Sequence, residues 1–528
     1  MKTSLLLAAL PFVAAITYKP PPDGPVANLD SGPIRGVRTS LRGGIGPVNK
    51  FYGVPYAEKP ERFGLPKKPT PWKTTRTAFK YGPSCNQFIS HTDIGSDYKV
   101  VDEIYNNHPA ESEDCLFANV FAPSWKGPSD GRPIVLFIQG GGFQLGNGEI
   151  DMSGFAAYED IIAISFNYRT NIFGFPNSPD IPLKERNLGL YDQRLAIQWV
   201  QTNAAAFGGN SSKVTLWGES AGSMSIDAHL QAYAKSKPAP FRAGILSSGQ
   251  FSFGPLSFGP NSSDHSTWEV VAAQVGCPKN DTQLDCMRKV PVKKLLEAQD
   301  HAQASFEPLT DGYTLLPGRA KSWRAGKVAR VPILTGTVRD EGRSLVNTNI
   351  SLRTFEDVYL PTGLVTKKQK DAILGYYKKI PGLRTDFAPS HPLPNRRSPP
   401  NAHMALPLQP VHHPLLPPQF AYLQKFHASD TILLFSGPSF EGGNIPGLTP
   451  ELYSFATYWR GQIADFVRNP GAGSLSWPAV GGKYKQDVAV LGDVGNVQVA
   501  GGRAVDVKSL DQRCSLYQDI YKALEKFA

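Results

Sequence analysis

The sequence lacks the residue spacings that mark several common classes of protein. Only five cysteines and ten histidines occur in 528 residues, and no two of them show the spacing typical of a zinc site. After the first residues, the apolar runs are only as long as a strand, so no transmembrane helix is predicted there. The formal charge of +10 is spread over separate lysine pairs, without a nucleic-acid recognition module or interleaved stacking aromatics. We therefore expect no metal, no organic cofactor, no nucleic-acid partner and no stable membrane insertion.

The beginning of the sequence predicts export. Met1 to Ser4 form a short positive start, Leu5 to Val13 an apolar run, and Val13-Ala14-Ala15 a small-residue cleavage site. This pattern is typical of a signal peptide over residues 1–15, with the mature chain beginning at Ile16 and located outside the cell. The candidate glycosylation sites, each opening an N-x-Ser/Thr sequon, are Asn210, Asn261, Asn280 and Asn349.

A glycine-flanked serine is the most specific motif. Gly218-Glu219-Ser220-Ala221-Gly222 follows an apolar, strand-like run over 213–217 and opens a helix-like run over 224–230. Glycines two residues before and after a serine permit a sharp strand-to-helix turn that holds the hydroxyl above the sheet. This context predicts Ser220 as a nucleophile. The alternative is an ordinary loop serine between turn glycines.

Consecutive glycines upstream complement this serine. Residues 133–138 form an apolar, strand-like run that leads into Gln139 and three glycines. Backbone N–H groups in such a loop converge on a developing oxyanion. We predict that the amides of Gly141, Gly142 and Ala221 form the oxyanion hole.

Several further segments resemble type-B carboxylesterases, the family that contains fungal esterases and lipases as well as cholinesterases. Besides the triple-glycine loop, they are Phe51 to Ala57, Ser112 to Leu116, Phe166 to Arg169, Asn187 to Gln193, Phe207 to Gly209, Thr310 to Gly312, Phe466 to Pro470, and Trp477-Pro478. They follow the family's order over nearly the whole chain. The resemblance implies one α/β-hydrolase domain over 16–528, with a large, mostly parallel central sheet flanked by helices. One departure is Gln139, where the family usually has histidine.

The acid and base are expected after the serine, in that order. Four histidines lie in a proline-rich stretch, which is unsuited to holding an imidazole rigidly. They are His391, His403, His412 and His413. His427 instead lies in Phe426-His427-Ala428-Ser429-Asp430, which resembles the family's His-Gly-Ser-Asp segment. The strand-like run over 331–338 leads to Asp340 and Glu341; spacing does not choose between them, and the resemblance selects Glu341. The expected triad is thus Ser220, His427 and Glu341.

The resemblance also implies two disulfides. Cys85 with Cys115 closes a loop near the active site, Cys277 with Cys286 closes a small one, and Cys514 is left unpaired. Glu219, beside the nucleophile, is expected either to join a buried polar network or to form a structural ion pair.

The loop between Cys85 and Cys115 bears on the substrate. Its polar residues include Asp93, Ser96, Asp97, Asp102, Glu103, Asn106 and Asn107. This composition favours an esterase for soluble or medium-sized esters over an interfacial lipase, and the lack of tryptophan gives no support for a choline site. Phe143, Phe173 and Phe175 are candidates for the pocket wall, although core packing is their default interpretation.

Two other classes of function use the same scaffold. One is a non-catalytic binding protein, whose family members usually lack the serine. The other is a biosynthetic acyltransferase or cyclase, which uses the same triad but excludes water. A panel of chromogenic esters, with and without an acyl acceptor, separates them.

The proline- and histidine-rich stretch over 381–419 does not match the helix and strand that the family places before its histidine. Because long structureless loops are uncommon inside compact domains, we predict that this segment is either a disordered surface insertion or a gene-model artefact, in which non-coding or wrongly framed sequence has displaced the expected helix and strand, and we favour the latter. Mass spectrometry of the natural secreted protein tests this. Peptides covering Asn395 to His413 would exclude the second origin.

Overall fold

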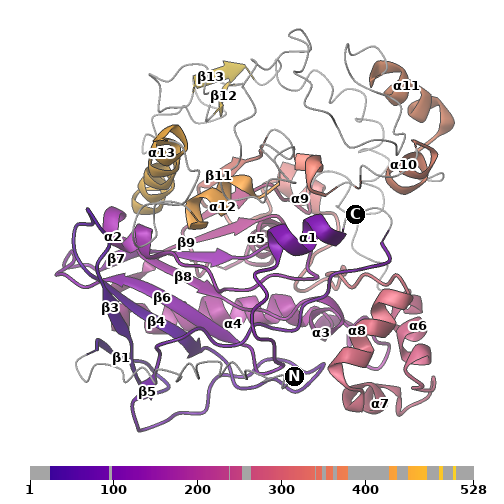
Figure 1. The fold of residues 1–528 in the computed structure, drawn as a ribbon, viewed down its shortest axis with the longest axis horizontal. Helices are drawn as coiled ribbons and strands as arrows, with labels where there is room; N and C mark the ends of the chain where they lie inside the picture. The colour runs from indigo at the N-terminus through magenta and orange to yellow at the C-terminus, as the bar shows by residue number, and fades with distance from the viewer. Residues whose placement is uncertain are drawn as a thin grey trace, which may run out of the picture.

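The computed structural model describes residues 24–93, 98–236, 238–252, 263–338, 341–345, 347, 352–360, 365–377, 427–436, 450–471, 487–490 and 503–506 (Figure 1). The segment 381–419, Asp340, Cys514, Asn261, Asn349 and the predicted signal peptide lie outside these ranges. The centre is an eight-stranded sheet with the order β11-β10-β9-β7-β8-β6-β4-β3.

The strands of this sheet are β3 (Val37–Thr39), β4 (Val48–Pro55), β6 (Phe117–Pro123), β7 (Arg132–Ile138), β8 (Ile162–Phe166), β9 (Gly209–Glu219), β10 (Ala243–Ser247) and β11 (Ile333–Gly336). Outside it lie β1 (Val26–Asn28), β2 (Pro33–Arg35), β5 (Arg76–Thr77), β12 (Asp487–Val490) and β13 (Arg503–Asp506).

The helices are α1 (Tyr98–Tyr105), α2 (Ser153–Glu159), α3 (Asn171–Gly174), α4 (Leu188–Asn203), α5 (Ala221–Ala232), α6 (Ser266–Gln274), α7 (Gln283–Lys289), α8 (Val292–His301), α9 (Arg319–Arg324), α10 (Leu352–Tyr359), α11 (Lys367–Tyr377), α12 (Ser429–Ser436) and α13 (Pro450–Arg468). Short 3₁₀ turns are η1 (Leu183–Glu185), η2 (Ala204–Phe207) and η3 (Glu341–Arg343). In the described ranges no helix combines the length and apolarity needed to cross a membrane.

The central strands are apolar on both faces because each face carries its own core. In β7, Ile134 and Leu136 point to one core, whereas Val135 and Phe137 point to the other. Helices α4 and α5 cover the first core, and α2, α12 and α13 cover the second. In Figure 1, α2 and α13 lie together on one side of the sheet. A strand buried on both faces is typical of a parallel sheet between helical layers.

The strands from β8 to β11 run parallel, whereas β6, β4 and β3 continue the sheet in antiparallel pairs. The chain leaves β7 to form β8 on one side and returns to form β9 on the other. This reversal brings the carboxyl ends of β7 and β9 together, with Ile138 opposite Gly218. Ligands of open α/β sheets bind outside such a switch point. The predicted α/β-hydrolase fold, with its large and mostly parallel sheet, is confirmed.

The glycines around Ser220 allow α5 to approach the sheet closely. A Cβ on Gly222 would lie only 1.9 Å from the carbonyl oxygen of Ile138, at the end of β7. A Cβ on Gly218 would lie 2.4 Å from the carbonyl carbon of Gly222. Since neither contact is sterically possible, both positions require glycine.

This packing predicts that Gly222→Ala destabilises the fold by about 1–3 kcal/mol, because the methyl group forces α5 away from β7. Gly461→Ala, in α13, is the matched control, since a Cβ there meets no atom within 4 Å. Alanine is favoured over glycine in helices, so the control variant should be at least as stable as the parent. Denaturant unfolding of the three proteins measures the difference. Equal stability of Gly222→Ala and the parent would contradict the packing argument.

Candidate active site

Ser220 lies in the turn between β9 and α5. Its φ of 53° places a non-glycine residue in the left-handed region, a strained conformation that is common at functional sites. Its backbone N–H donates to the carbonyl of Ser247, at the end of β10, over 2.9 Å. Its side chain is partly exposed and stands at the amino end of α5, where the helix dipole favours negative charge.

The glycine loop after β7 lies against this serine. A Cβ on Gly140 would lie 2.9 Å from the Cβ of Ser220, so the two backbones are adjacent. Gly141 and Gly142 have φ values of 102° and 61°, and the Gly141 carbonyl accepts from the amide of Gln144 over 2.9 Å. Within the described residues, the amides of Gly141 and Gly142 donate to no backbone carbonyl, and Ala221 begins helix α5, where the first amides have no partner within the helix. The loop therefore offers free donors beside Ser220.

His427 and Glu341 form a direct pair at the same edge of the sheet. His427 Nδ1 lies 2.5 Å from Glu341 Oε2, and the His427 side chain is 9% exposed. Glu341 follows β11, and its Oε1 accepts from the amide of Val338 over 3.0 Å. The Thr337 hydroxyl donates to the same oxygen. These bonds fix the carboxylate that orients the imidazole.

The other imidazole nitrogen faces Glu219. His427 Nε2 lies 3.1 Å from Glu219 Oε1, although the angle is too poor for a hydrogen bond and both atoms remain without one. In the part of the chain that the structure describes, no hydrogen bond joins His427 to Ser220. Of the three predicted triad residues, the structure thus pairs the acid with the base and places Glu219 beside the nitrogen that would receive the serine proton.

Burial and three carboxylates control the charges of the site. Burial raises the pKa of Glu219 to about 8, against the opposing effect of His427. Burial alone would lower the pKa of His427, but Glu219, Glu341 and Asp430 raise it to about 8. Burial would raise the pKa of Glu341, yet the hydrogen bond and charge of His427 hold it below its ordinary value. Glu341 therefore stays ionised, and the share of molecules with a neutral His427 imidazole, the form that can accept a proton, grows as the pH rises through about 8.

Gln139 occupies the position where the family resemblance expects histidine. Its side chain is 4% exposed, and neither its amide nitrogen nor its amide oxygen has a hydrogen-bond partner. Its backbone carbonyl accepts from the Tyr168 hydroxyl over 3.0 Å. Glutamine in place of histidine at position 139 therefore keeps the hydrogen bond that holds the backbone at the start of the glycine loop.

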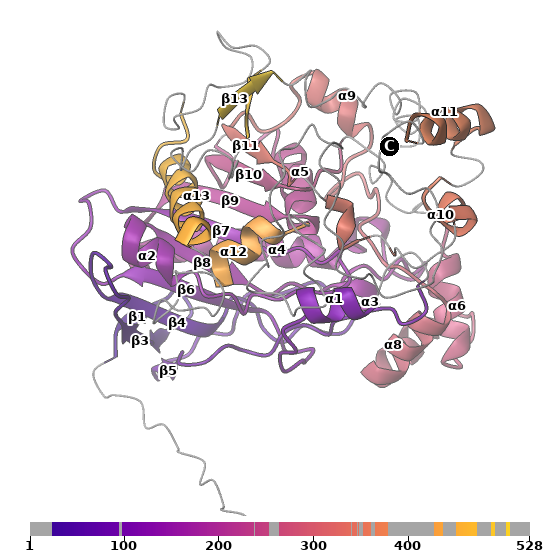
Figure 2. The same cartoon turned by 45° about the horizontal axis from the view of Figure 1, so that its top comes forward.

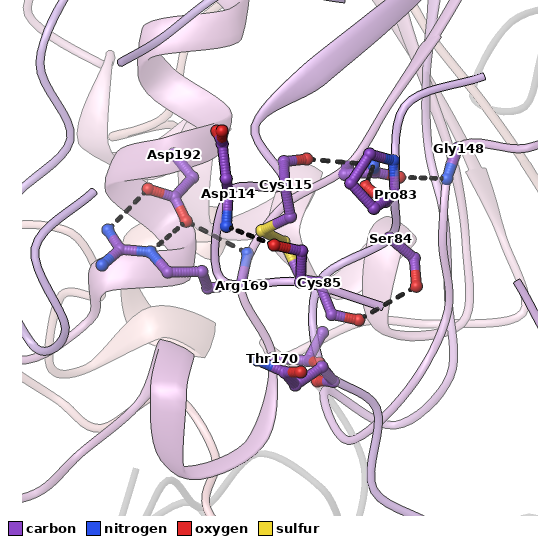
Figure 3. Close-up of a disulfide and its surroundings, with 12 residues drawn as sticks. Pro83, Ser84, Cys85, Asp114, Cys115, Gly148, Arg169, Thr170 and Asp192 are labelled. Atoms are coloured by element: carbon purple, nitrogen blue, oxygen red, sulfur yellow. Dashed lines mark hydrogen bonds and ion pairs between the residues drawn. A yellow bond between two sulfur atoms is a disulfide. The ribbon is translucent and has the colours of Figure 1, made fainter. Parts of the chain in front are cut away.

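Both expected disulfides are present in the structure. The Cα atoms of Cys85 and Cys115 are 4.9 Å apart, and those of Cys277 and Cys286 are 5.6 Å apart. Figure 3 shows the first bond beside the buried ion pair between Arg169 and Asp192, whose Nη2 and Oδ1 atoms are 2.7 Å apart. The side-chain Nδ2 of Asn167 donates to the Cys115 carbonyl over 3.0 Å. This hydrogen bond connects the disulfide with the segment that directly follows β8.

The loop between Cys85 and Cys115 contains helix α1. The sequence alone does not reveal the role of this helix. Ile104 and Tyr105 of α1 and Ile432 of α12 pack against the buried Val100, so the apolar face of α1 points inward. The Tyr105 hydroxyl donates to the His427 carbonyl over 3.0 Å. The i, i+4 spacing of Val100 and Ile104 is the signal that the sequence offers for this helix, but these residues lie in a mostly polar loop.

Three further expectations concern groups outside the expected triad and oxyanion hole. The aromatic rings of Phe143, Phe173 and Phe175 are buried in the main core, which agrees with their default interpretation. Asn280 is exposed and Asn210 is partly exposed. Within the described ranges, no three His, Cys, Asp or Glu side chains are grouped closely enough to hold a metal ion.

Comparison with known sequences gives evidence about the family of this chain that does not depend on the geometry of the site. The family model described as Carboxylesterase family matches residues 23–374. The chain is 32% identical to the cholinesterase of Mus musculus over 405 residues, which cover 71% of this chain and 64% of that protein. It is 30% identical to the para-nitrobenzyl esterase of Bacillus subtilis (strain 168) over 469 residues, which cover 82% of this chain and 89% of that protein.

The carboxylates around His427 predict an imidazole that titrates near pH 8. Glu219→Gln removes a negative charge that stabilises the imidazolium, so the titration midpoint should move to lower pH. Nuclear magnetic resonance of histidine-labelled protein measures both midpoints. Glu149→Gln is the control, because Glu149 is not among the groups that shift His427. A midpoint that stays constant or rises in Glu219→Gln would contradict this electrostatic account.

Proposed function

Because the chain belongs to the carboxylesterase family, we propose that it is a secreted serine esterase in which Ser220, His427 and Glu341 hydrolyse carboxylic esters through an acyl-enzyme. Members of this family hydrolyse carboxylic esters. The catalytic residues, the covalent intermediate and the extracellular location are what we propose for this chain beyond the activity of its family.

One juxtaposition supports the proposal most directly. The elbow serine, the free amides of the glycine loop and the His427–Glu341 pair all lie where neighbouring parallel strands end. A nucleophile, an oriented base and oxyanion donors are the groups that acyl transfer needs.

In the first step, Ser220 Oγ attacks the ester carbonyl carbon while its proton passes to His427 Nε2. The amides of Gly141, Gly142 and Ala221 donate to the oxyanion that forms. The alcohol then leaves with the proton from His427, and the acyl group remains on Ser220. Water repeats the sequence, which releases the acid and restores the serine.

This sequence requires a small rearrangement of the resting site. His427 Nε2 faces Glu219 in the structure, and it must approach Ser220 Oγ when substrate binds. Catalytic hydrogen bonds often form fully only in the substrate complex. Glu341, which holds Nδ1, keeps the correct tautomer and stabilises the imidazolium throughout.

The proposed substrates are soluble or medium-sized esters. The apolar face of α1 packs onto Ile432 and is therefore not available as a lipid-binding lid. The name of the bacterial relative suggests para-nitrobenzyl esters as the first probes. The two disulfides and the exposed Asn280 are consistent with a glycosylated, extracellular protein.

We predict that Ser220→Ala lowers turnover of para-nitrobenzyl acetate by at least about 10,000-fold, because the covalent step is lost. A fluorophosphonate should label the parent on the tryptic peptide containing Ser220 and should not label the variant. Steady-state assays and peptide mass spectrometry measure these outcomes. Labelling of another residue would refute the assignment.

Two controls accompany this experiment. Glu341→Gln should lower turnover much more than Asp340→Asn; the reverse ranking would exchange the two acids. Thermal unfolding of Ser220→Ala should match the parent, since only a hydroxyl is removed. Product formation that requires an added acyl acceptor would identify the acyltransferase class instead.

A further inference from the structure

Tyr105 connects the disulfide-closed loop with the histidine turn. It is the last residue of α1, and its hydroxyl donates to the His427 carbonyl over 3.0 Å. The same oxygen lies 2.5 Å from the hydroxyl oxygen of Ser344. Because a phenol has one hydrogen and a carbonyl can only accept, the Ser344 hydroxyl must donate to Tyr105.

These bonds join three segments that are distant in sequence. Ser344 is 2% exposed and directly follows the η3 turn that carries Glu341. His427 directly precedes Ala428 and helix α12. A single hydroxyl therefore contacts both the acid turn and the histidine turn from a third element.

Apolar packing supports the same connection. Ile104, Tyr105 and Ile432 all pack against the buried Val100, and Ile432 lies one helical turn into α12. Both views of the fold place α1 beside α12 (Figures 1 and 2). The hydroxyl is thus aimed by a helix that is itself fixed against the helix following His427.

We propose that Tyr105 is a positioning residue, which sets the place of the His427 imidazole by holding the backbone carbonyl of that residue. This role rests on the proposed function of His427 as the general base. Burial raises the pKa of Tyr105, so its hydroxyl stays protonated and donates throughout the working pH range. The bond matters because a displacement of about 1 Å at a reacting group costs around 100-fold in rate.

If Tyr105 only stabilised the fold, loss of its hydroxyl would affect kcat no more than loss of a similar hydroxyl far from His427. Tyr56 provides this matched control. The Tyr56 hydroxyl also donates to a backbone carbonyl, that of Asn167, over 2.6 Å. Tyr56 is fully buried in the main core and touches neither Ser220 nor His427. Tyr56→Phe therefore removes the same kind of bond without affecting the histidine.

The test compares Tyr105→Phe, Tyr56→Phe and the parent with para-nitrobenzyl acetate. Tyr105→Phe should lower kcat about 10- to 100-fold, leave KM within about twofold, and slow fluorophosphonate labelling of Ser220 in proportion. Tyr56→Phe should keep the parental kcat. Both variants should melt within a few degrees of the parent, because each loses one hydrogen bond.

Ser344→Ala provides a second route if Tyr105→Phe folds poorly. It removes the hydroxyl that donates to Tyr105, and its loss of kcat should be smaller than that of Tyr105→Phe. Combined in one chain, the two changes should cost no more than Tyr105→Phe alone, since they act through one bond.

Three outcomes would overturn the proposal. They are a parental kcat in Tyr105→Phe, an equal loss of kcat in Tyr56→Phe, and full additivity of the Tyr105 and Ser344 changes. In each case the parent still hydrolyses the ester through Ser220, so the proposed function stands. Absence of Ser220-dependent hydrolysis in the parent would instead overturn both.

Discussion

The close approach of helix α5 to the end of strand β7 is the contact on which the candidate site depends. It is possible only because Gly222 has no side chain, since a Cβ would lie 1.9 Å from the Ile138 carbonyl oxygen. The approach places the amide of Ala221 beside the glycine loop that follows Ile138. It also forces Ser220 into its left-handed conformation. One steric constraint therefore determines the orientation of the nucleophile and of the proposed oxyanion donors together.

Backbone strain is concentrated around this contact. Phe143, Ser220, Ser248 and Ala428 all have positive φ, and each belongs to a loop that borders the site. Such conformations typically cost about 1–3 kcal/mol each and persist only where the surrounding structure enforces them. Ala428 occupies a position where the carboxylesterase family has glycine. Its φ of 65° explains why glycine is preferred there, since glycine adopts positive φ without steric cost. This chain maintains the same turn with a less suitable residue, next to the histidine that the turn positions.

The sequence predicted those features that depend on local patterns. Glycine spacing identified the elbow at Ser220, apolar runs identified the central strands, and the family resemblance, which is confirmed, led to His427 and Glu341. The contacts of Tyr105 and the approach of Glu219 to His427 could not be predicted in this way. They join side chains from segments far apart in the chain, and their geometry depends on how α1 and α12 pack. The sequence alone allows Glu219 either a buried polar network or a structural ion pair; the structure places it beside the imidazole.

The Cys85–Cys115 bond also has a consequence for the order of assembly. Its two cysteines are only 30 residues apart and both precede His427 in the sequence, so the bond can close before the histidine is synthesised. His427 is made much later. During synthesis, the loop that carries Tyr105 can therefore be covalently complete before the histidine turn exists. The last catalytic segment then docks onto a surface that is already formed, and the growing chain has no complete catalytic machinery until that docking takes place.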